Sequence, residues 1–211
     1  MSGETSLRID SSKRIIRIRP LLYDSNVKIN KRMKTVKILD REFRVSIPAE
    51  KIDNAIAEMA EKMNKDLAGK NPMFICVLNG SFMFASDLMK LITVENAEIT
   101  FMRLSSYEGM GTTGKVKKLM GFTEDLKDRT VVILEDIIDT GITMANTLVQ
   151  IEEYKAKEIL VATMLFKPDA LKRDVKIDYK CLDIPNDFIV GRGLDYDGIG
   201  RNLPDVYTVI D

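Results

Sequence analysis

The 211-residue sequence predicts an α/β fold: a central, mainly parallel sheet flanked by helices, with a small hood lobe over one end of the sheet. Apolar runs such as MFICVL (73–78) and VVILED (131–136) alternate with segments of helical periodicity, which is typical of parallel sheets. A hairpin pattern near the start and short strands after Tyr179 do not fit this alternation. We expect these outer segments to form the hood.

The first half of the regular region predicts a hairpin, a long helix, a strand and a second helix. Short strands at 36–39 and 43–47 are joined at Asp40–Arg41, and Pro48 suits the first turn of the helix that follows. A strand at 73–78 leads to a helix at 82–92. The first helix has an apolar face, which we interpret as core rather than as a cofactor site, formed by Ile52, Ala55, Ile56, Met59, Met63 and Leu67.

The second half continues the alternation. A strand at 97–106 precedes a polar, glycine-rich stretch at 107–114. The buried strand at 131–136 is followed by a helix at 143–154 and a strand at 158–166. The tail from Tyr179 then predicts short strands, separated at 185–186 and at 191–193.

Composition limits the classes of function. Lysine plus arginine and aspartate plus glutamate both number 32, so the formal net charge is zero. Proteins that bind nucleic acid through bulk charge carry a basic excess, so we expect no nucleic-acid partner, with a local basic patch left open. The chain has no histidine, so acid–base chemistry near neutral pH falls to carboxylates, lysine, tyrosine or cysteine. With two cysteines only, zinc sites of the common kind are not expected.

The two cysteines and the N-terminus indicate the cell compartment. Cys76 and Cys181 are flanked by apolar residues, and we interpret them as buried free thiols rather than a disulfide, which fits a reducing cytoplasm. No apolar run approaches the roughly 20 residues of a membrane span. We expect residues 1–32 to be a flexible extension translated from an upstream start, and residues 33–211 to form one domain. A basic arm that binds a partner is the alternative for 1–32.

Polar chemistry gathers at three predicted strand ends. These are Asn79–Ser81, Glu135–Thr143 and Phe166–Asp169. In an open parallel sheet, ligands bind beyond the carboxyl ends of the strands. We therefore expect one crevice to be lined by all three segments.

The segment EDIIDTGIT (135–143) predicts a site for a phosphorylated sugar. Backbone N–H groups at the start of the following helix favour an anion, and Gly141 lets the backbone approach it, but the Walker spacing is absent. Glu135 and Asp136 can accept hydrogen bonds from vicinal hydroxyls or hold Mg²⁺. A phosphate beside such carboxylates describes a ribose 5-phosphate, with Asp139 left to carry a proton. A helix-capping cluster with incidental acids is the alternative, but a cap needs only one such residue.

The run VVILEDIIDTGIT (131–143) closely resembles the phosphoribosyl-pyrophosphate signature of purine phosphoribosyltransferases, and in particular of the hypoxanthine-guanine branch. The resemblance extends from about Val36 to Ile210. It implies a type I phosphoribosyltransferase-like fold. It also implies transfer of the 5-phosphoribosyl group from phosphoribosyl pyrophosphate to N9 of hypoxanthine or guanine, giving IMP or GMP and pyrophosphate, with Mg²⁺ as cofactor.

The resemblance also implies roles for the residues of this run. Glu135 and Asp136 lie along the ribose hydroxyls and belong to the metal site, and Asp139 lies near purine N7 as general base or acid. The backbone and hydroxyls of Thr140, Gly141, Ile142 and Thr143 hold the 5-phosphate. Ile142 replaces a lysine of some relatives, so its side-chain contact is lost and its N–H remains.

Further residues are implied to bind the base and the pyrophosphate. Lys167 reads the purine 6-oxo group, Phe188 stacks on the base, and the main chain of Ile189 meets the purine edge. A solvated surface lysine and a core phenylalanine are the alternatives for Lys167 and Phe188. Asp195 is a Mg²⁺-linked carboxylate, and Arg201 lies near pyrophosphate.

Two loops complete the implied site. Asn79–Gly80 corresponds to a loop that binds pyrophosphate through its backbone, where several relatives have lysine instead of asparagine. Ser106–Tyr107 corresponds to the start of a mobile loop that closes over the site, with a flexible surface hairpin as the alternative. The resemblance further implies a homo-oligomer, either a dimer or a tetramer.

Rival functions remain open from the sequence. One is a phosphoribosyltransferase that prefers xanthine or a pyrimidine, although FKPD (166–169) and the short hood favour a 6-oxopurine. The other is a regulatory protein that senses nucleotides on the same fold. Zero net charge and the complete set of catalytic-type residues weigh against this regulator.

Overall fold

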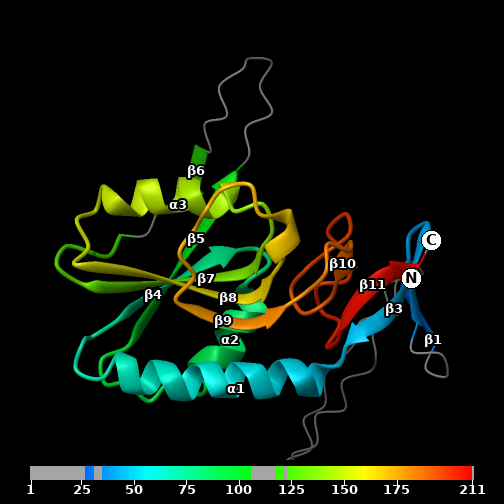
Figure 1. The fold of residues 1–211 in the computed structure, drawn as a ribbon, viewed down its shortest axis with the longest axis horizontal. Coiled ribbons are helices and arrows are strands. Elements are labelled where there is room, and N and C mark those ends of the chain that lie inside the picture. Colours follow the sequence, from blue (N-terminus) through cyan, green and yellow to red (C-terminus); the bar gives the residue numbers. More distant parts are fainter. Residues whose placement is uncertain (1–26, 31–34, 106–116, 121–122, 211) are drawn as a thin grey trace, which may run out of the picture.

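A six-stranded sheet forms the body of the molecule (Figure 1). The computed structural model describes residues 27–30, 35–105, 117–120 and 123–210. From one edge to the other, the strands of the body are β6 (Lys117–Met120), β5 (Glu98–Ser105), β4 (Met73–Leu78), β7 (Thr130–Ile138), β8 (Glu158–Phe166) and β9 (Tyr179–Asp183). Strands β5, β4, β7, β8 and β9 run parallel, and β6 pairs antiparallel with β5. The mainly parallel sheet predicted from the sequence is confirmed.

Helices cover both faces of this sheet. In Figure 1, helix α3 (Ile142–Glu152) lies above the sheet, and helices α1 (Ala49–Asp66) and α2 (Phe82–Met89) lie below it. Along β4, Phe74 and Cys76 belong to the core beneath the sheet, whereas Ile75 and Val77 belong to the core above it. Because both sets are buried, the strand is apolar at every position.

The hood is a second, antiparallel sheet with a small core of its own. Its strands, in spatial order, are β1 (Val27–Asn30), β2 (Thr35–Ile38), β3 (Arg41–Ile47), β11 (Val206–Ile210) and β10 (Ile189–Val190). The opening hairpin and the last strands of the chain therefore meet, as predicted. The core of the hood consists of Val36, Ile38, Phe43, Val190, Leu203 and Tyr207.

The hood begins earlier in the chain than expected. Strand β1 pairs in register with β2, from Val27 opposite Ile38 to Asn30 opposite Thr35. It lies within the segment 1–32 that the sequence analysis assigns to an extension. Alternation of Val27 and Ile29 with polar neighbours is the signal that favours a strand here. Residues 1–26 lie outside the described part, and the division at residue 33 stays a prediction.

Strand β9 corrects one expectation, because it belongs to the body and not to the hood. It pairs parallel with β8, and Ala162 lies opposite Tyr179. The Tyr179 hydroxyl donates to the carboxylate of Asp66 at the end of α1, 3.2 Å away. This contact and the apolar packing of Tyr179 in the lower core fix β9 against α1.

Strand β7 is longer than predicted. It continues to Ile138, and its last residues Ile137 and Ile138 pair with Leu165 and Phe166 of β8. The first two acids of the EDIIDTGIT segment therefore lie inside the strand. Asp139 and Lys167, which directly follow these two strands, are therefore brought side by side. Their position decides the geometry of the site.

Both cysteines are free, as the sequence predicts. Cys76 is buried, and Cys181 is partly buried. Desolvation raises the pKa of the Cys76 thiol to about 11 and that of Cys181 to about 12. In the described part of the chain, no helix is long and apolar enough to span a membrane.

Candidate active site

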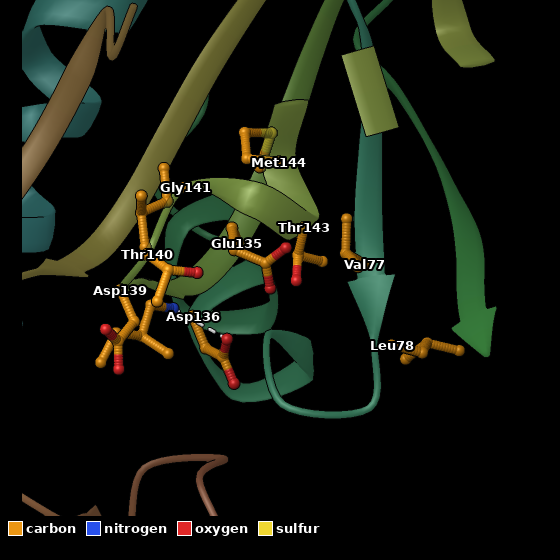
Figure 2. A pocket seen from close by; sticks show the side chains of 11 residues that line it. Val77, Leu78, Glu135, Asp136, Asp139, Thr140, Gly141, Thr143 and Met144 are labelled. Carbon is orange, nitrogen blue, oxygen red and sulfur yellow. Dashed lines mark hydrogen bonds between the residues drawn. The ribbon is translucent and has the colours of Figure 1, made fainter. Parts of the chain in front are cut away.

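A cavity of about 330 Å³ opens at the carboxyl ends of β4 and β7, against the first turn of α3 (Figure 2). Val77 and Leu78 line it from β4. Figure 2 shows the acidic and hydroxyl side chains gathered where β7 passes into α3. Of the three strand ends expected to line one crevice, only the segment 135–143 lines this cavity, through the polar residues Glu135, Asp136, Asp139, Thr140 and Thr143. Residues 79–81 and 166–169 lie outside the lining, although Lys167 reaches Asp139 at its rim.

Two adjacent carboxylates lie buried in the cavity wall. Glu135 and Asp136 are each 8% exposed. Asp136 Oδ1 accepts the Ile137 N–H at 2.8 Å, whereas Glu135 Oε2 is buried with no hydrogen-bond partner among the described residues. Burial and the neighbouring Asp136 raise the pKa of Glu135 well above its usual range, and burial also raises the pKa of Asp136. Such a pair favours ligands that bring hydroxyl donors or a cation.

Gly80 is enclosed between two other segments of the site. A Cβ atom at Gly80 would lie 1.5 Å from Asp136 Oδ2, and one at Gly193 would lie 1.9 Å from the Gly80 carbonyl oxygen. Neither position can carry a side chain. The backbone at Gly80 therefore meets the Asp136 side chain at the end of β7 on one side and the backbone of the loop after β10 on the other.

The turn from β7 into α3 has the form of an anion site. Gly141 is the N-cap residue with φ 75°, and no side chain caps the helix. The Thr140 carbonyl oxygen accepts the N–H groups of Lys172 and Arg173, both at 3.0 Å, so the turn is fixed to the segment after β8. The Ile142 N–H makes only a long contact of 3.5 Å to Thr140 Oγ1. Because the first N–H groups of a helix have no partner within it, those at the start of α3 can be offered to an anion in the cavity.

Asp139 and Lys167 form a pair at the ends of neighbouring strands. They follow Ile138 and Phe166, which are opposite each other in the β7–β8 register. Lys167 Nζ donates to Asp139 Oδ2 at 3.2 Å. The Lys167 side chain is 8% exposed and that of Asp139 is 44% exposed. Lys167 is therefore not the solvated surface lysine that the sequence left open.

The hood presents Phe188 as an exposed aromatic ring. Phe188 is 43% exposed, so it is not a buried core residue. Its ring centroid lies 5.8 Å from that of Tyr196, edge-on, and 6.3 Å from that of Phe43. The Arg41 guanidinium lies 5.9 Å from the same centroid. Ile189 next to it is buried and pairs with Thr208 of β11, so the ring directly precedes a fixed strand.

Asp195 and Arg201 bind each other in the loop after β10. Arg201 Nη2 lies 2.6 Å from Asp195 Oδ1, and Arg201 Nη1 donates to the Gly193 carbonyl oxygen at 2.7 Å. Asp195 Oδ2 accepts the Gly198 N–H at 2.6 Å. Both oxygens of Asp195 are therefore engaged within its own loop. The positive charge of Arg201 also favours the ionised form of Asp136 and partly offsets the effect of burial on the pKa of that carboxyl.

The metal site predicted from the sequence is only partly assembled. Within the described ranges, no group of three or more histidine, cysteine, aspartate or glutamate side chains could hold a metal ion. Glu135 and Asp136 are adjacent, but Asp195 is occupied by Arg201 and Gly198. The spacing in sequence gave no sign of this internal neutralisation.

Some residues predicted to belong to the site are exposed, and others lie outside the described part of the chain. Asn79 is exposed beside Gly80, and Ile142 is exposed at the start of α3. Ser106 and Tyr107 lie outside the described residues. Gly193 was not among the predicted site residues, although the Gly-Arg-Gly spacing at 191–193 is a signal for close backbone approach.

Fold and site together define a class. The parallel sheet, the uncapped helix start and the buried carboxylate pair describe a protein that binds phosphorylated sugars. The family model for the phosphoribosyl transferase domain matches residues 48–197. The chain therefore belongs to the phosphoribosyltransferase family.

Within that family, the chain is similar to hypoxanthine-guanine phosphoribosyltransferases. It is 41% identical over 163 residues to such an enzyme of Streptococcus thermophilus, covering 76% of this chain and 89% of that one. It is 45% identical over 149 residues to one of Streptococcus agalactiae, covering 70% and 82%. A hypoxanthine phosphoribosyltransferase structure from Staphylococcus aureus superposes with a TM-score of 0.75 at 35% identity, covering 79% of this chain and 91% of the other.

The raised pKa of Glu135 predicts a measurable effect on stability. Between the usual value of 4.5 and the raised value, the folded protein keeps a proton that the unfolded chain has lost, so stability falls as pH rises through this window. Glu135→Gln should therefore stabilise the protein, free of substrate and Mg²⁺, by about 0.5–2 kcal/mol near neutral pH. Near about pH 4.5 the gain should vanish. Urea unfolding at both pH values, with Glu61→Gln on the exposed side of α1 as control, measures it. An equal gain at both pH values contradicts the explanation.

Gly141 allows a second test, because Gly69 offers a matched control. The two glycines have φ values of 75° and 73°, but a Cβ at Gly141 would lie 2.3 Å from the Arg173 carbonyl oxygen, and one at Gly69 has nothing within 4 Å. Gly69→Ala should cost about 1 kcal/mol of unfolding free energy from backbone strain alone. Gly141→Ala should cost at least about 1 kcal/mol more. Chemical denaturation decides it, and equal losses would show that the Arg173 contact does not matter.

Proposed function

We propose that this protein transfers the 5-phosphoribosyl group from phosphoribosyl pyrophosphate to N9 of hypoxanthine or guanine, releasing pyrophosphate. The observation that carries the proposal is the pair of Lys167 and Asp139, 3.2 Å apart at the ends of β8 and β7. The carboxylate pair and the uncapped start of α3 support the choice of sugar donor.

The Lys167–Asp139 pair complements one edge of a 6-oxopurine. That edge offers an acceptor, O6, next to N7–H, a donor. Lysine only donates and an ionised aspartate only accepts, so Lys167 binds O6 and Asp139 binds N7–H. Adenine has an amino donor in place of O6, and this donor would face the buried Lys167 ammonium, which is also a donor. Neither donor would then find an acceptor in the other, which leaves polar groups unpaired. The pair therefore favours oxo over amino purines.

The donor substrate fits the rest of the cavity. The 5-phosphate binds at the N–H groups of Ile142 and Thr143 and at the hydroxyls of Thr140 and Thr143. The ribose hydroxyls donate to Glu135 and Asp136. The pyrophosphate lies towards the Gly80 backbone and Arg201, since both adjoin Asp136.

The carboxylate pair also fits Mg²⁺. This ion is bound in many enzymes by one or two carboxylates together with substrate phosphates, and Glu135 Oε2 is a buried oxygen without a partner in the described part of the structure. Glu135 and Asp136 would hold the ion, with Asp195 turned away to Arg201. When bound, Mg²⁺ neutralises charge on the leaving pyrophosphate.

The residues of the chain then divide the reaction between them. The bond from the sugar C1′ to the pyrophosphate oxygen breaks, and its electron pair leaves with pyrophosphate. Purine N9 forms the new bond to C1′, and the N7 proton passes to the Asp139 carboxylate. Glu135 and Asp136 favour the positive charge that develops on the sugar, while Arg201 stabilises the leaving group.

Asp139→Asn tests the proton transfer. The amide cannot take the N7 proton, so kcat should fall about 10²- to 10⁴-fold while the KM values for both substrates change little. Steady-state formation of IMP measures both constants. The exposed carboxylate of Asp174 provides the control substitution, Asp174→Asn. A turnover that stays at the wild-type level would remove Asp139 from the mechanism.

Lys167→Met tests the reading of the base. Loss of the Lys167 ammonium donor should lower kcat/KM for hypoxanthine. The ratio of kcat/KM for hypoxanthine to that for adenine should fall by about 10-fold or more. Rates with hypoxanthine, guanine, xanthine and adenine are compared in the presence of Mg²⁺. A wild-type rate highest with xanthine would favour the xanthine-specific alternative. No turnover with any purine, together with tight nucleotide binding, would favour a nucleotide sensor.

A further inference from the structure

Arg192 is a buried arginine that the reaction described above does not use. Its side chain is 7% exposed. It lies between Gly191 and Gly193, and all three residues have positive φ values, of 98°, 52° and 104°. A non-glycine residue in this region is strained, and such strain persists only where the surroundings hold it in place. The strain at Arg192 therefore points to a strongly fixed segment.

The guanidinium of Arg192 connects the loop after β10 to two helices of the body. It pairs with Asp87 of α2 at 2.8 Å and with Asp53 of α1. Its Nη1 also donates to the Pro204 carbonyl oxygen at 3.4 Å, whereas Nε is buried without a partner among the described residues. A buried guanidinium is costly unless it is paired, so the two carboxylates hold this side chain in place.

The contacts of the same segment lead directly to the site. Gly193, the next residue, packs against the Gly80 carbonyl oxygen, and Gly80 packs against Asp136. Gly193 also accepts the hydrogen bond from Arg201 at 2.7 Å. Helix α2, which carries Asp87, begins at residue 82, two residues after Gly80. Figure 1 shows the segment after β10 lying between the body and the hood.

We propose that Arg192 is a positioning residue for the pyrophosphate end of the donor site. Through Asp87 it fixes α2, and with it the Gly80 loop, against the loop that carries Gly193 and Arg201. The inference rests on the proposed function, because it assigns the purpose of the contact to the binding of phosphoribosyl pyrophosphate. Asp53 anchors the same guanidinium to α1, which contributes no residue to the cavity.

The two aspartates allow a matched experiment. Asp87→Ala and Asp53→Ala each remove one carboxylate partner of Arg192 from within a helix, so the change in helix propensity is the same. Asp87 also pairs with the exposed Lys90 at 2.8 Å, and Lys90→Ala controls for the loss of that pair. Asp87→Ala should weaken phosphoribosyl pyrophosphate by about 10-fold, in KM and in the calorimetric Kd measured with Mg²⁺, because a shift of about 1 Å in a binding loop can cost about 100-fold. The KM for hypoxanthine should stay within about twofold. Asp53→Ala should change neither constant by more than about twofold.

Arg192 itself is tested with Met and Lys. Arg192→Met should weaken the sugar donor at least as much as Asp87→Ala, and Arg192→Lys should recover part of the loss, since it keeps a cation near Asp87. Thermal unfolding of each variant accompanies the kinetics. Should Arg192→Met fail to fold, the comparison of Asp87→Ala with Asp53→Ala still decides.

The outcomes separate the positioning role from the proposed function. Equal effects of the two aspartate variants, or a lowered Tm with an unchanged KM for the sugar donor, would overturn the positioning role and leave the enzyme assignment intact. If the wild type binds phosphoribosyl pyrophosphate but forms no nucleotide, the proposed function fails, while the calorimetric Kd values still support or overturn the role of Arg192. A wild type that does not bind the sugar donor overturns both.

Discussion

The site depends on two adjacent carboxylates that are buried at the end of the central strand. Glu135 and Asp136 have raised pKa values because burial disfavours their ionised forms, and Glu135 has a buried oxygen without a partner in the described part of the chain. Among the described residues, neither a hydroxyl donor nor a cation reaches Glu135 Oε2. A phosphorylated sugar with its metal ion brings both, so ligand binding completes an arrangement that the fold alone leaves unfavourable.

Burial of these carboxylates also determines the sequence around them. Asp136 occupies the space that a side chain at residue 80 would need, and the Gly80 carbonyl occupies the space at residue 193. The Gly80 loop can therefore approach the Asp136 carboxylate, and the Gly193 loop can approach Gly80, only because residues 80 and 193 carry no side chain. The same contacts join the body to the hood, because the loop of Gly193 follows strand β10 of the second sheet. The contacts that hold the lobes together thus adjoin Asp136, where the proposed function places the pyrophosphate.

The strands and the phosphate turn could be predicted from local sequence patterns, whereas features set by tertiary contacts could not. Strand β8 has the predicted bounds, and the apolar runs of β4 and β7 are strands, because burial on both faces leaves a continuous apolar signature. The predicted phosphate turn at 140–143 does lie at the start of a helix. Strand β9 was assigned to the wrong lobe, since its partner β8 is set by tertiary packing. The engagement of Asp195 by Arg201 and the anchoring of Arg192 also depend on contacts between side chains that no spacing reveals.

The absence of histidine gives the Asp139–Lys167 pair a double role. With no imidazole in the chain, proton transfer near neutral pH falls to a carboxylate, and Asp139 is the exposed one in the cavity. Its position beside Lys167 follows from the register of β7 and β8, which is a property of the backbone. In the proposed reaction, the two groups that bind the O6 and N7 edge therefore include the group that takes the N7 proton. Under this proposal, a purine without that edge loses its binding contact and its route for the proton together, so selection of the base and catalysis would depend on one pair of strand ends.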